Sequence, residues 1–241
     1  MRRPLARRPS SEFTPIAWGT DPPCPIFIRM EVKICGIKDA DATDTACEAG
    51  AAMLGFVFYP PSPRAIGAEW AGALISRIPA GIVPVGLFVD ADDDTIQRVL
   101  ELAPLKLLQL HGKESPERCA AVRARFGLPV MKALGIATEA DLALLEAYAP
   151  VVDRFLLDAK PPEGATLPGG NAAIFDWSLL AGCAIPRPWL LAGGLTPGNV
   201  AAAIRATGAP GVDVSSGVER ARGVKDPELI RAFAAAALAQ P

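Results

Sequence analysis

The chain has 241 residues, of which 51% are hydrophobic and 21% are charged, and its formal net charge is −2. This length fits one large or two small domains, and the charge excludes the basic surface on which nucleic-acid binding depends. No apolar run approaches the roughly 20 residues of a membrane-spanning helix, so we expect neither nucleic-acid nor membrane partners.

The cysteines and the single histidine limit the chemistry that the chain can perform. No two cysteines form a C-x-x-C pair, and their odd number of five favours reduced thiols, so we expect a cytoplasmic protein. The single histidine, His111, excludes sites that need several histidines, such as histidine-rich zinc centres, and we predict no metal site. The cysteines are Cys24, Cys35, Cys47, Cys119 and Cys183.

Residues 1–29 differ from the rest of the chain. They are rich in arginine and proline, show no periodic apolar pattern, and lack the apolar core of a secretion signal. Met30 directly precedes the first clear strand. We interpret residues 1–29 as a disordered or mis-assigned extension and residues 30–241 as the folded domain, with a targeting role for the extension as the alternative.

From residue 32 onward, short apolar runs alternate with helical stretches. The predicted strands cover residues 32–36, 52–58, 83–89, 105–110, 130–134, 154–158, 189–192 and 211–214. The predicted helices lie near residues 39–49, 68–78, 93–102, 116–126, 139–147, 173–181, 197–207 and 227–239. Ser115-Pro116, Thr196-Pro197 and Asp226-Pro227 each predict an N-cap followed by proline at the first helical position, and Thr138 with Asp141 resembles a capping box.

The strand runs are continuously apolar, which is typical of parallel strands covered on both faces. Eight strand–helix units therefore predict a single-domain α/β fold, a (β/α)8 TIM barrel. A doubly wound open sheet is the competing architecture, but the first strand is not followed by the G-x-G-x-x-G turn that such sheets usually carry.

Two small-residue loops predict a phosphate site. In a barrel of this kind, phosphate binds after the seventh and eighth strands. The seventh strand runs into Gly193 and Gly194, and the eighth into Ser215, Ser216 and Gly217. Glycine permits close backbone approach, and free N–H groups there can hold a phosphate dianion, whereas plain tight turns are the alternative.

Cys35 ends the first strand and Asp158 ends the sixth, so both lie at the end of the barrel where catalytic residues gather. Taken alone, Cys35 would be a small buried hydrophobe, and Asp158 a partner of Lys160 or a helix cap. Together they could form an acid–base pair. A lowered pKa keeps a cysteine in the thiolate form, which can accept a proton. A raised pKa keeps a partly buried carboxyl protonated, so that it can donate one.

Four further residues are candidates for substrate binding. Arg64 follows a proline-rich loop and suits carboxylate recognition, with a solvated loop arginine as the alternative. Gln109 and His111 end the fourth strand, and we interpret His111 as a structural or positioning group rather than the base. Asp213, inside the eighth strand, could hydrogen-bond a ligand hydroxyl or a neighbouring backbone group.

A series of segments within residues 32–233 closely resembles the phosphoribosylanthranilate isomerase family of tryptophan biosynthesis. They are KICGI (33–37), GFVFYPPSPR (55–64), VGLFVD (85–90), LQLHG (108–112), LLDA (156–159), FDW (175–177), LAGGLTPGNV (191–200) and GVDVSSGVE (211–219), with Lys225-Asp226 beyond.

The resemblance implies a (β/α)8 barrel enzyme, without cofactor, that rearranges N-(5-phosphoribosyl)anthranilate to 1-(2-carboxyphenylamino)-1-deoxyribulose 5-phosphate. It implies that Cys35 is the general base, that Asp158 is the general acid, and that Arg64 meets the anthranilate carboxylate. Its members are monomers or homodimers. The chain departs from the family pattern at Asn171-Ala172, within an otherwise glycine-rich stretch, and at Arg222, where proline is frequent.

Three alternatives remain. The related isomerase of histidine biosynthesis uses aspartates as acid and base, and Cys35 argues against it, although acceptance of both substrates stays open. Indole-glycerol-phosphate synthase has a different first strand and uses lysines and a glutamate. A non-catalytic barrel that binds a phosphorylated ligand would keep the phosphate loops but lose the acid or the base, and both are present here.

Overall fold

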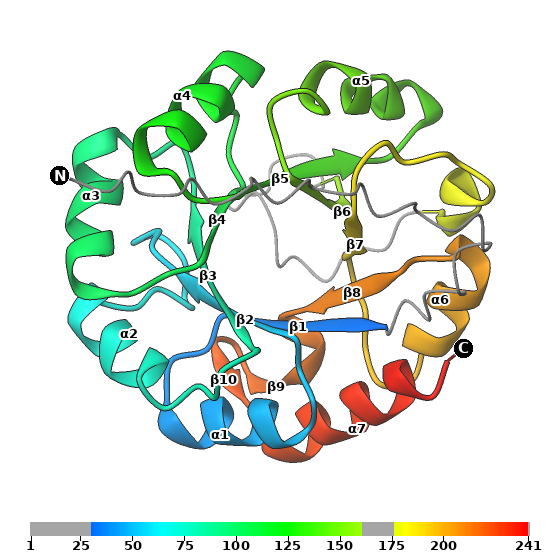
Figure 1. The fold of residues 1–241 in the computed structure, drawn as a ribbon. Coiled ribbons are helices and arrows are strands. Elements are labelled where there is room, and N and C mark those ends of the chain that lie inside the picture. The colour runs from blue at the N-terminus through cyan, green and yellow to red at the C-terminus, as the bar shows by residue number, and fades with distance from the viewer. Residues whose placement is uncertain (1–29, 161–175, 241) are drawn as a thin grey trace, which may run out of the picture.

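Eight parallel strands close into a barrel in the order β1-β2-β3-β4-β5-β6-β7-β8 (Figure 1). This computed structural model describes residues 30–160 and 176–240. Closure comes from β1, which pairs with β2 on one side and with β8 on the other. The strands are β1 (Glu31–Cys35), β2 (Met53–Val57), β3 (Val83–Phe88), β4 (Leu107–Leu110), β5 (Val130–Ile136), β6 (Arg154–Ala159), β7 (Trp189–Leu191) and β8 (Gly211–Val214). The predicted barrel is confirmed, and the doubly wound sheet is excluded.

Helices surround this barrel, as Figure 1 shows. They are α1 (Ala40–Glu48), α2 (Ala68–Ile75), α3 (Asp93–Leu102), α4 (Pro116–Phe126), α5 (Leu144–Tyr148), α6 (Val200–Thr207) and α7 (Pro227–Leu238). Single 3-10 turns lie at η1 (Glu139–Ala143), η2 (Trp177–Leu180) and η3 (Ser216–Val218), and a two-stranded hairpin follows β8 as β9 (Glu219–Ala221) and β10 (Val224–Lys225). None of the described helices is long and apolar enough to cross a membrane.

Two of the three predicted proline-containing helix starts are confirmed. Ser115 accepts a hydrogen bond from the N–H of Arg118, and Asp226 accepts one from the N–H of Glu228. The third prediction is wrong, because α6 begins at Val200 and not after Thr196.

The side chain of Asn199 replaces the cap predicted at Thr196. Its Oδ1 accepts from the N–H of Thr196 at 2.7 Å, and its Nδ2 donates to the carbonyl of Gly194 at 3.0 Å. These bonds hold residues 197–199 in a turn. Two other helices also differ from the prediction: the segment 139–147 divides into η1 and α5, and the described part of 173–181 forms only the 3-10 turn η2.

The barrel interior is divided into an apolar layer and a polar one. Side chains alternate between the two faces of a strand, so every second residue points inward. An apolar cluster fills one end of the interior: Met53, Val85, Leu107, Met131, Ala133, Leu156, Leu190 and Ala192. Cys35 packs nearer the carboxyl ends of the strands, with Val57 and Leu87. The register pairs Lys33 of β1 with Asp213 of β8, and so places two charged residues inside the barrel.

Candidate active site

Cys35 lies at the carboxyl end of β1 and is only 4% exposed. Lys33, two residues earlier on the same face of β1, is fully buried, and its Nζ donates to Oδ1 of Asp213 at 2.8 Å. Gly55 of β2 is paired with Cys35. A Cβ at Gly55 would lie 2.9 Å from the Cys35 Sγ and 3.1 Å from the Lys33 Nζ. The thiol and the ammonium group therefore converge over a position that only glycine leaves open.

The charges around Cys35 act in opposite directions on its thiol. Burial raises the pKa of Cys35 above its ordinary value, the positive charges of Lys33 and Lys225 lower it, and Asp213 raises it. Burial also acts to lower the pKa of Lys33, but Asp213 and Cys35 outweigh this effect and leave that pKa raised. Lys33 therefore keeps its positive charge beside the thiol at neutral pH.

Asp158 lies near the carboxyl end of β6, facing the inside of the barrel. Its Oδ1 accepts from the N–H of Ala159 at 2.8 Å, and its Oδ2 is 3.5 Å from Nε2 of His111. Lys160 pairs with Asp141 instead, at 3.0 Å, so the alternative of an Asp158–Lys160 salt bridge is wrong. The carboxyl group of Asp158 is thus directed toward a histidine and the mouth of the barrel.

Gln109 and His111 form a chain that leads to Asp158. Nε2 of Gln109 lies 2.9 Å from Nδ1 of His111. When this amide donates, Nδ1 accepts, and the imidazole carries its proton on Nε2, facing the carboxylate. Oε1 of Gln109 is buried without a hydrogen-bond partner among the described residues. The structure therefore brings together three of the residues predicted for the site, in the order Gln109, His111, Asp158.

A second buried ion pair fixes the loop that carries His111. Nζ of Lys132 donates to the carbonyl of Gly112 at 2.7 Å and to Glu114 at 2.8 Å. Glu114 also accepts from the N–H groups of Gly112 and Asp90, each at 2.9 Å. Glu114 and Lys132 in this way join the loops after β3 and β4. Their bonds to Gly112 hold the backbone next to His111 in place.

Arg64 is 5% exposed, so the alternative of a solvated loop arginine is wrong. Its Nε and Nη2 donate to the two carboxylate oxygens of Glu219 at 2.7 and 3.0 Å. Its aliphatic stem covers Gly36, where φ is +82° and a Cβ would lie 2.8 Å from Cδ of Arg64. Nη1 makes no hydrogen bond to any residue that the structure describes, and is the atom of this guanidinium left for a ligand.

Glu219 joins three segments of the site. It accepts from Lys225 Nζ and from the N–H of Gly223, both at 2.9 Å, in addition to Arg64. Burial acts to raise its pKa, but Arg64 and Lys225 outweigh burial and hold the pKa of Glu219 at about 2. Lys225 also donates to the carbonyl of Ser215 at 2.9 Å. Glu219 is therefore an ionised carboxylate that ties the β2 loop to the loop after β8.

The two predicted phosphate loops lie side by side. Gly193 and Gly194 have φ values of +91° and +61°, which favour glycine, and their N–H groups donate to no described residue. A Cβ at Gly217 would lie 1.8 Å from the carbonyl oxygen of Leu195, so the loop after β8 packs directly against the loop after β7. Ser215 is held by a bond from its Oγ to the carbonyl of Cys35 at 3.1 Å, and Ser216 follows it at the start of η3.

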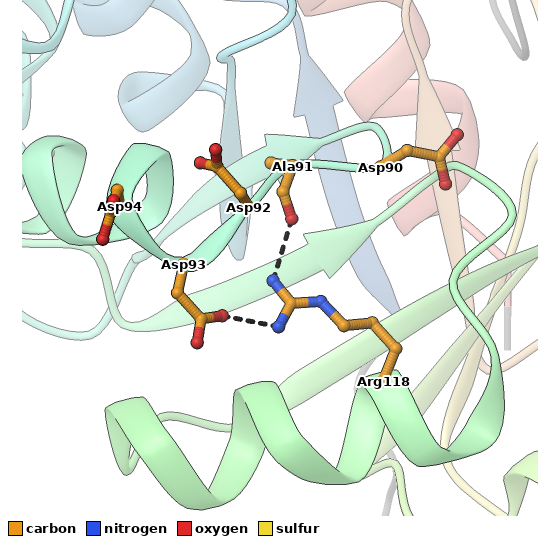
Figure 2. A pocket seen from close by; sticks show the side chains of 6 residues that line it. All are labelled: Asp90, Ala91, Asp92, Asp93, Asp94 and Arg118. Carbon is orange, nitrogen blue, oxygen red and sulfur yellow. Dashed lines mark hydrogen bonds and ion pairs between the residues drawn. The ribbon is translucent and has the colours of Figure 1, made fainter.

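An acidic hollow at the rim of the barrel begins at Asp90, whose N–H is bound to Glu114. It is lined by Asp90, Ala91, Asp92, Asp93, Asp94 and Arg118. Figure 2 shows the Arg118 side chain reaching from α4 to the Asp93 carboxylate and the Ala91 carbonyl, while Asp90 and Asp94 point away. Within residues 30–160 and 176–240, no group of three or more His, Cys, Asp and Glu side chains could hold a metal ion. The hollow is therefore neutralised in part by an internal arginine.

Sequence reasoning missed four residues of the site: Lys33, Gly55, Glu219 and Lys225. A signal was present for the first of them. Lys33 and Asp213 are each a single charge inside an apolar strand, and buried charges of opposite sign are expected to pair. Nothing comparable marks Glu219, because its role depends on the hairpin that follows the barrel. The predicted departure at Asn171-Ala172 lies outside the described residues, as do residues 1–29 and Cys24.

Comparisons with known proteins agree on one family. The family model described as N-(5'phosphoribosyl)anthranilate (PRA) isomerase matches residues 32–236. The N-(5'-phosphoribosyl)anthranilate isomerase of Paramagnetospirillum magneticum is 57% identical over 208 residues, which cover 86% of this chain and 97% of that protein.

Solved structures give the same result. The phosphoribosyl anthranilate isomerase of Thermotoga maritima has a TM-score of 0.78 and 38% identity, covering 86% of this chain and 98% of its own. A second structure, of such an isomerase with reduced 1-(o-carboxyphenylamino)-1-deoxyribulose 5-phosphate, has a TM-score of 0.73 and 36% identity over the same shares.

Proposed function

The chain belongs to the N-(5'-phosphoribosyl)anthranilate isomerase family, and we propose that Cys35 is its general base and Asp158 its general acid. It is an isomerase of tryptophan biosynthesis that converts N-(5-phosphoribosyl)anthranilate to 1-(2-carboxyphenylamino)-1-deoxyribulose 5-phosphate. The observation that supports the two roles is the position of a thiol and a carboxyl on inward-facing strand ends at the same mouth of the barrel.

The reaction begins with ring opening. Protonated Asp158 gives its proton to the ribose ring oxygen while the bond from that oxygen to C1′ breaks. The lone pair of the anthranilate nitrogen forms the new C=N bond, which leaves a protonated Schiff base and an Asp158 carboxylate. Nε2 of His111 lies 3.5 Å from Oδ2 of Asp158 and orients the carboxyl group toward the sugar.

The second step removes a proton from carbon. The Cys35 thiolate takes the proton from C2′, the C–H electrons form the C1′=C2′ bond, and the C=N electrons return to nitrogen. The resulting enolamine tautomerises to the ketone by moving the hydroxyl proton to C1′. Each proton transfer by a placed group contributes roughly 10²–10⁴-fold to the rate.

The remaining residues bind and position the substrate. We assign the phosphate to the loop of Gly193 and Gly194 and to the loop of Ser215, Ser216 and Gly217. Arg64 meets the anthranilate carboxylate through Nη1, while Gln109, His111 and Asp213 contact the sugar. Binding energy from the distant phosphate positions the reacting carbons, which is how remote contacts raise the rate.

We also propose the wider setting of this activity. Residues 30–241 form the catalytic domain, which acts without cofactor as a monomer or homodimer in the cytoplasm. A phosphorylated small molecule is its partner.

The test is turnover of freshly generated phosphoribosylanthranilate, followed by the loss of its fluorescence. Cys35→Ala and Asp158→Asn should each lower kcat by at least about 10²-fold, because each removes one proton transfer. Cys183→Ala and Asp44→Asn are matched controls, since both residues lie on the surface, and should turn over like the unmodified protein. Near-full turnover by either site variant would overturn the corresponding role.

A further inference from the structure

Lys33 is a fully buried charge whose presence stability alone does not explain. It is among the largest side chains with no exposure, and its partner Asp213 is 7% exposed. A buried ion pair costs desolvation energy, and replacement of such pairs by apolar residues is often neutral or stabilising. Lys33 lies inside the barrel, in register with Met53 of β2, so its presence needs a reason beyond packing.

The geometry around Gly55 supplies that reason. Lys33 and Cys35 lie two residues apart on β1 and face the same side. The Cβ that Gly55 lacks would meet both the Cys35 Sγ, at 2.9 Å, and the Lys33 Nζ, at 3.1 Å. A larger residue at this position would stand between the thiol and the ammonium group. Because β2 has glycine at position 55, it leaves the space between the Cys35 thiol and the Lys33 ammonium group open.

Three charged groups act on the thiol from the elements packed around it. They are Lys33 from β1, Asp213 from β8 and Lys225 from β10, whereas β2 contributes no charged side chain. Lys225 is bound to Glu219 at 2.9 Å, and Glu219 also binds Arg64. Lys33 pairs with Asp213 at 2.8 Å, and of the two lysines it acts more strongly on the thiol.

We propose that Lys33 is a positioning residue for the reaction, which stabilises the thiolate form of Cys35 by direct charge against the burial that opposes it, while Asp213 keeps the lysine in place and limits its effect. This inference rests on the proposed role of Cys35 as the general base. A thiol accepts no proton, so the base must be ionised before C2′ is deprotonated. Lys33 opposes the burial that raises the pKa of the Cys35 thiol, and so makes the thiolate easier to form than burial alone would allow.

The proposal predicts shifts of opposite sign from two substitutions. An opposite charge within about 4–6 Å typically lowers the pKa of an acid by 1–3, so Lys33→Met should raise the pKa of Cys35 by at least about one pH unit. Asp213→Asn should lower that pKa, because it removes a negative charge and leaves the lysine. Lys33→Arg keeps the charge and should restore the titration toward that of the unmodified protein.

The test is a pH titration of thiolate absorbance in the ultraviolet, with the signal of Cys35→Ser subtracted to isolate Cys35 from the other cysteines. Circular dichroism checks that each variant is folded. Because Lys33→Met leaves Asp213 unpaired, the double variant Lys33→Met with Asp213→Asn provides a second measurement without a buried lone charge. It should also titrate above the unmodified protein, since Lys33 acts more strongly on the thiol than Asp213 does.

The same variants are then assayed for kcat/KM against pH. The acidic limb should move upward in Lys33→Met and in the double variant, in step with the absorbance titration. An unchanged absorbance midpoint in both would overturn the role of Lys33. Full turnover by Cys35→Ala would instead overturn Cys35 as the base, and the absorbance titration would still decide whether Lys33 ionises the thiol.

Discussion

Glu219 binds the guanidinium of Arg64 through both carboxylate oxygens, at 2.7 Å from Nε and 3.0 Å from Nη2, although 155 residues separate the two. The Arg64 side chain is 6% exposed and that of Glu219 is 4% exposed, so the pair is formed inside the protein. Two parallel bonds fix the plane of a guanidinium as well as its position. Arg64 is therefore oriented before any substrate carboxylate arrives.

The first prediction concerns this pair. Glu219→Gln removes the charge that holds Arg64 and Lys225, so the guanidinium loses its fixed plane. KM for phosphoribosylanthranilate should rise roughly tenfold, equivalent to about 1.4 kcal/mol, while kcat changes less. Steady-state kinetics provide the measurement, and Glu228→Gln, on α7, is the matched control. A lowered kcat at unchanged KM would assign Glu219 to the chemical step instead.

The second prediction is a loss of stability in acid. The pKa of Glu219 is lowered from 4.5 to about 2 in the folded protein. The ionised carboxylate therefore contributes its full stabilisation above pH 4.5. That contribution is lost as the pH falls from 4.5 toward 2, because in this range the unfolded chain binds a proton at Glu219 that the folded carboxylate does not. The free energy of unfolding should therefore fall more steeply across this range than in Glu219→Gln. The free energy of unfolding of each protein is measured by urea titration at several pH values. An equal fall with pH in the two proteins would refute the prediction.

The third prediction concerns the space between Cys35 and Lys33. Gly55→Ala places a methyl group 2.9 Å from the thiol, closer than real contacts permit, and 3.1 Å from the ammonium group, which is tighter than most real contacts. The two groups must move apart, and kcat should fall at least about tenfold, since small displacements at a reacting group are costly. Gly67→Ala is the control, because a Cβ there meets nothing within 4 Å. Equal activity of the two variants would show that the close approach is not needed.

The fourth prediction tests the phosphate loops. Gly193→Ala adds a Cβ 2.6 Å from the N–H nitrogen of Ala159 at a φ of +91°, so the loop must change shape. Inorganic phosphate should inhibit this variant more weakly, and KM should rise roughly tenfold, or about 1.4 kcal/mol. Gly182→Ala carries similar backbone strain, at φ +73°, in open space. If both variants bind phosphate equally, the loop after β7 does not hold it.

The eight strands could be predicted from sequence because burial on both faces leaves a continuous apolar run. The location of Cys35, Asp158 and the two glycine- and serine-containing loops could then be predicted, because a barrel places the carboxyl ends of all its strands at one mouth. The pairing of Lys33 with Asp213 was not predicted, because it exists only through the register that closes β1 against β8.

Other differences came from side-chain hydrogen bonds that the sequence patterns did not reveal. The start of α6 was wrong because Asn199 bonds to Thr196 and Gly194 across a turn, and so competes with the proline-containing cap. Glu219 was missed because β9 and β10 fold back onto the β2 loop, where the carboxylate meets Arg64. The first difference is a local turn held by one side chain, whereas the second depends on a contact between segments that are far apart in the sequence.

The division of labour between Cys35 and Asp158 is tested most directly by the isotope effect of a substrate carrying deuterium at C2′. In Cys35→Ser, removal of the C2′ proton becomes the slow step, so the effect on kcat/KM should be as large as that step allows. In Asp158→Asn, ring opening becomes slow, so the effect should fall toward one. The reverse pattern, or equal effects in both variants, would contradict the assignment of base and acid.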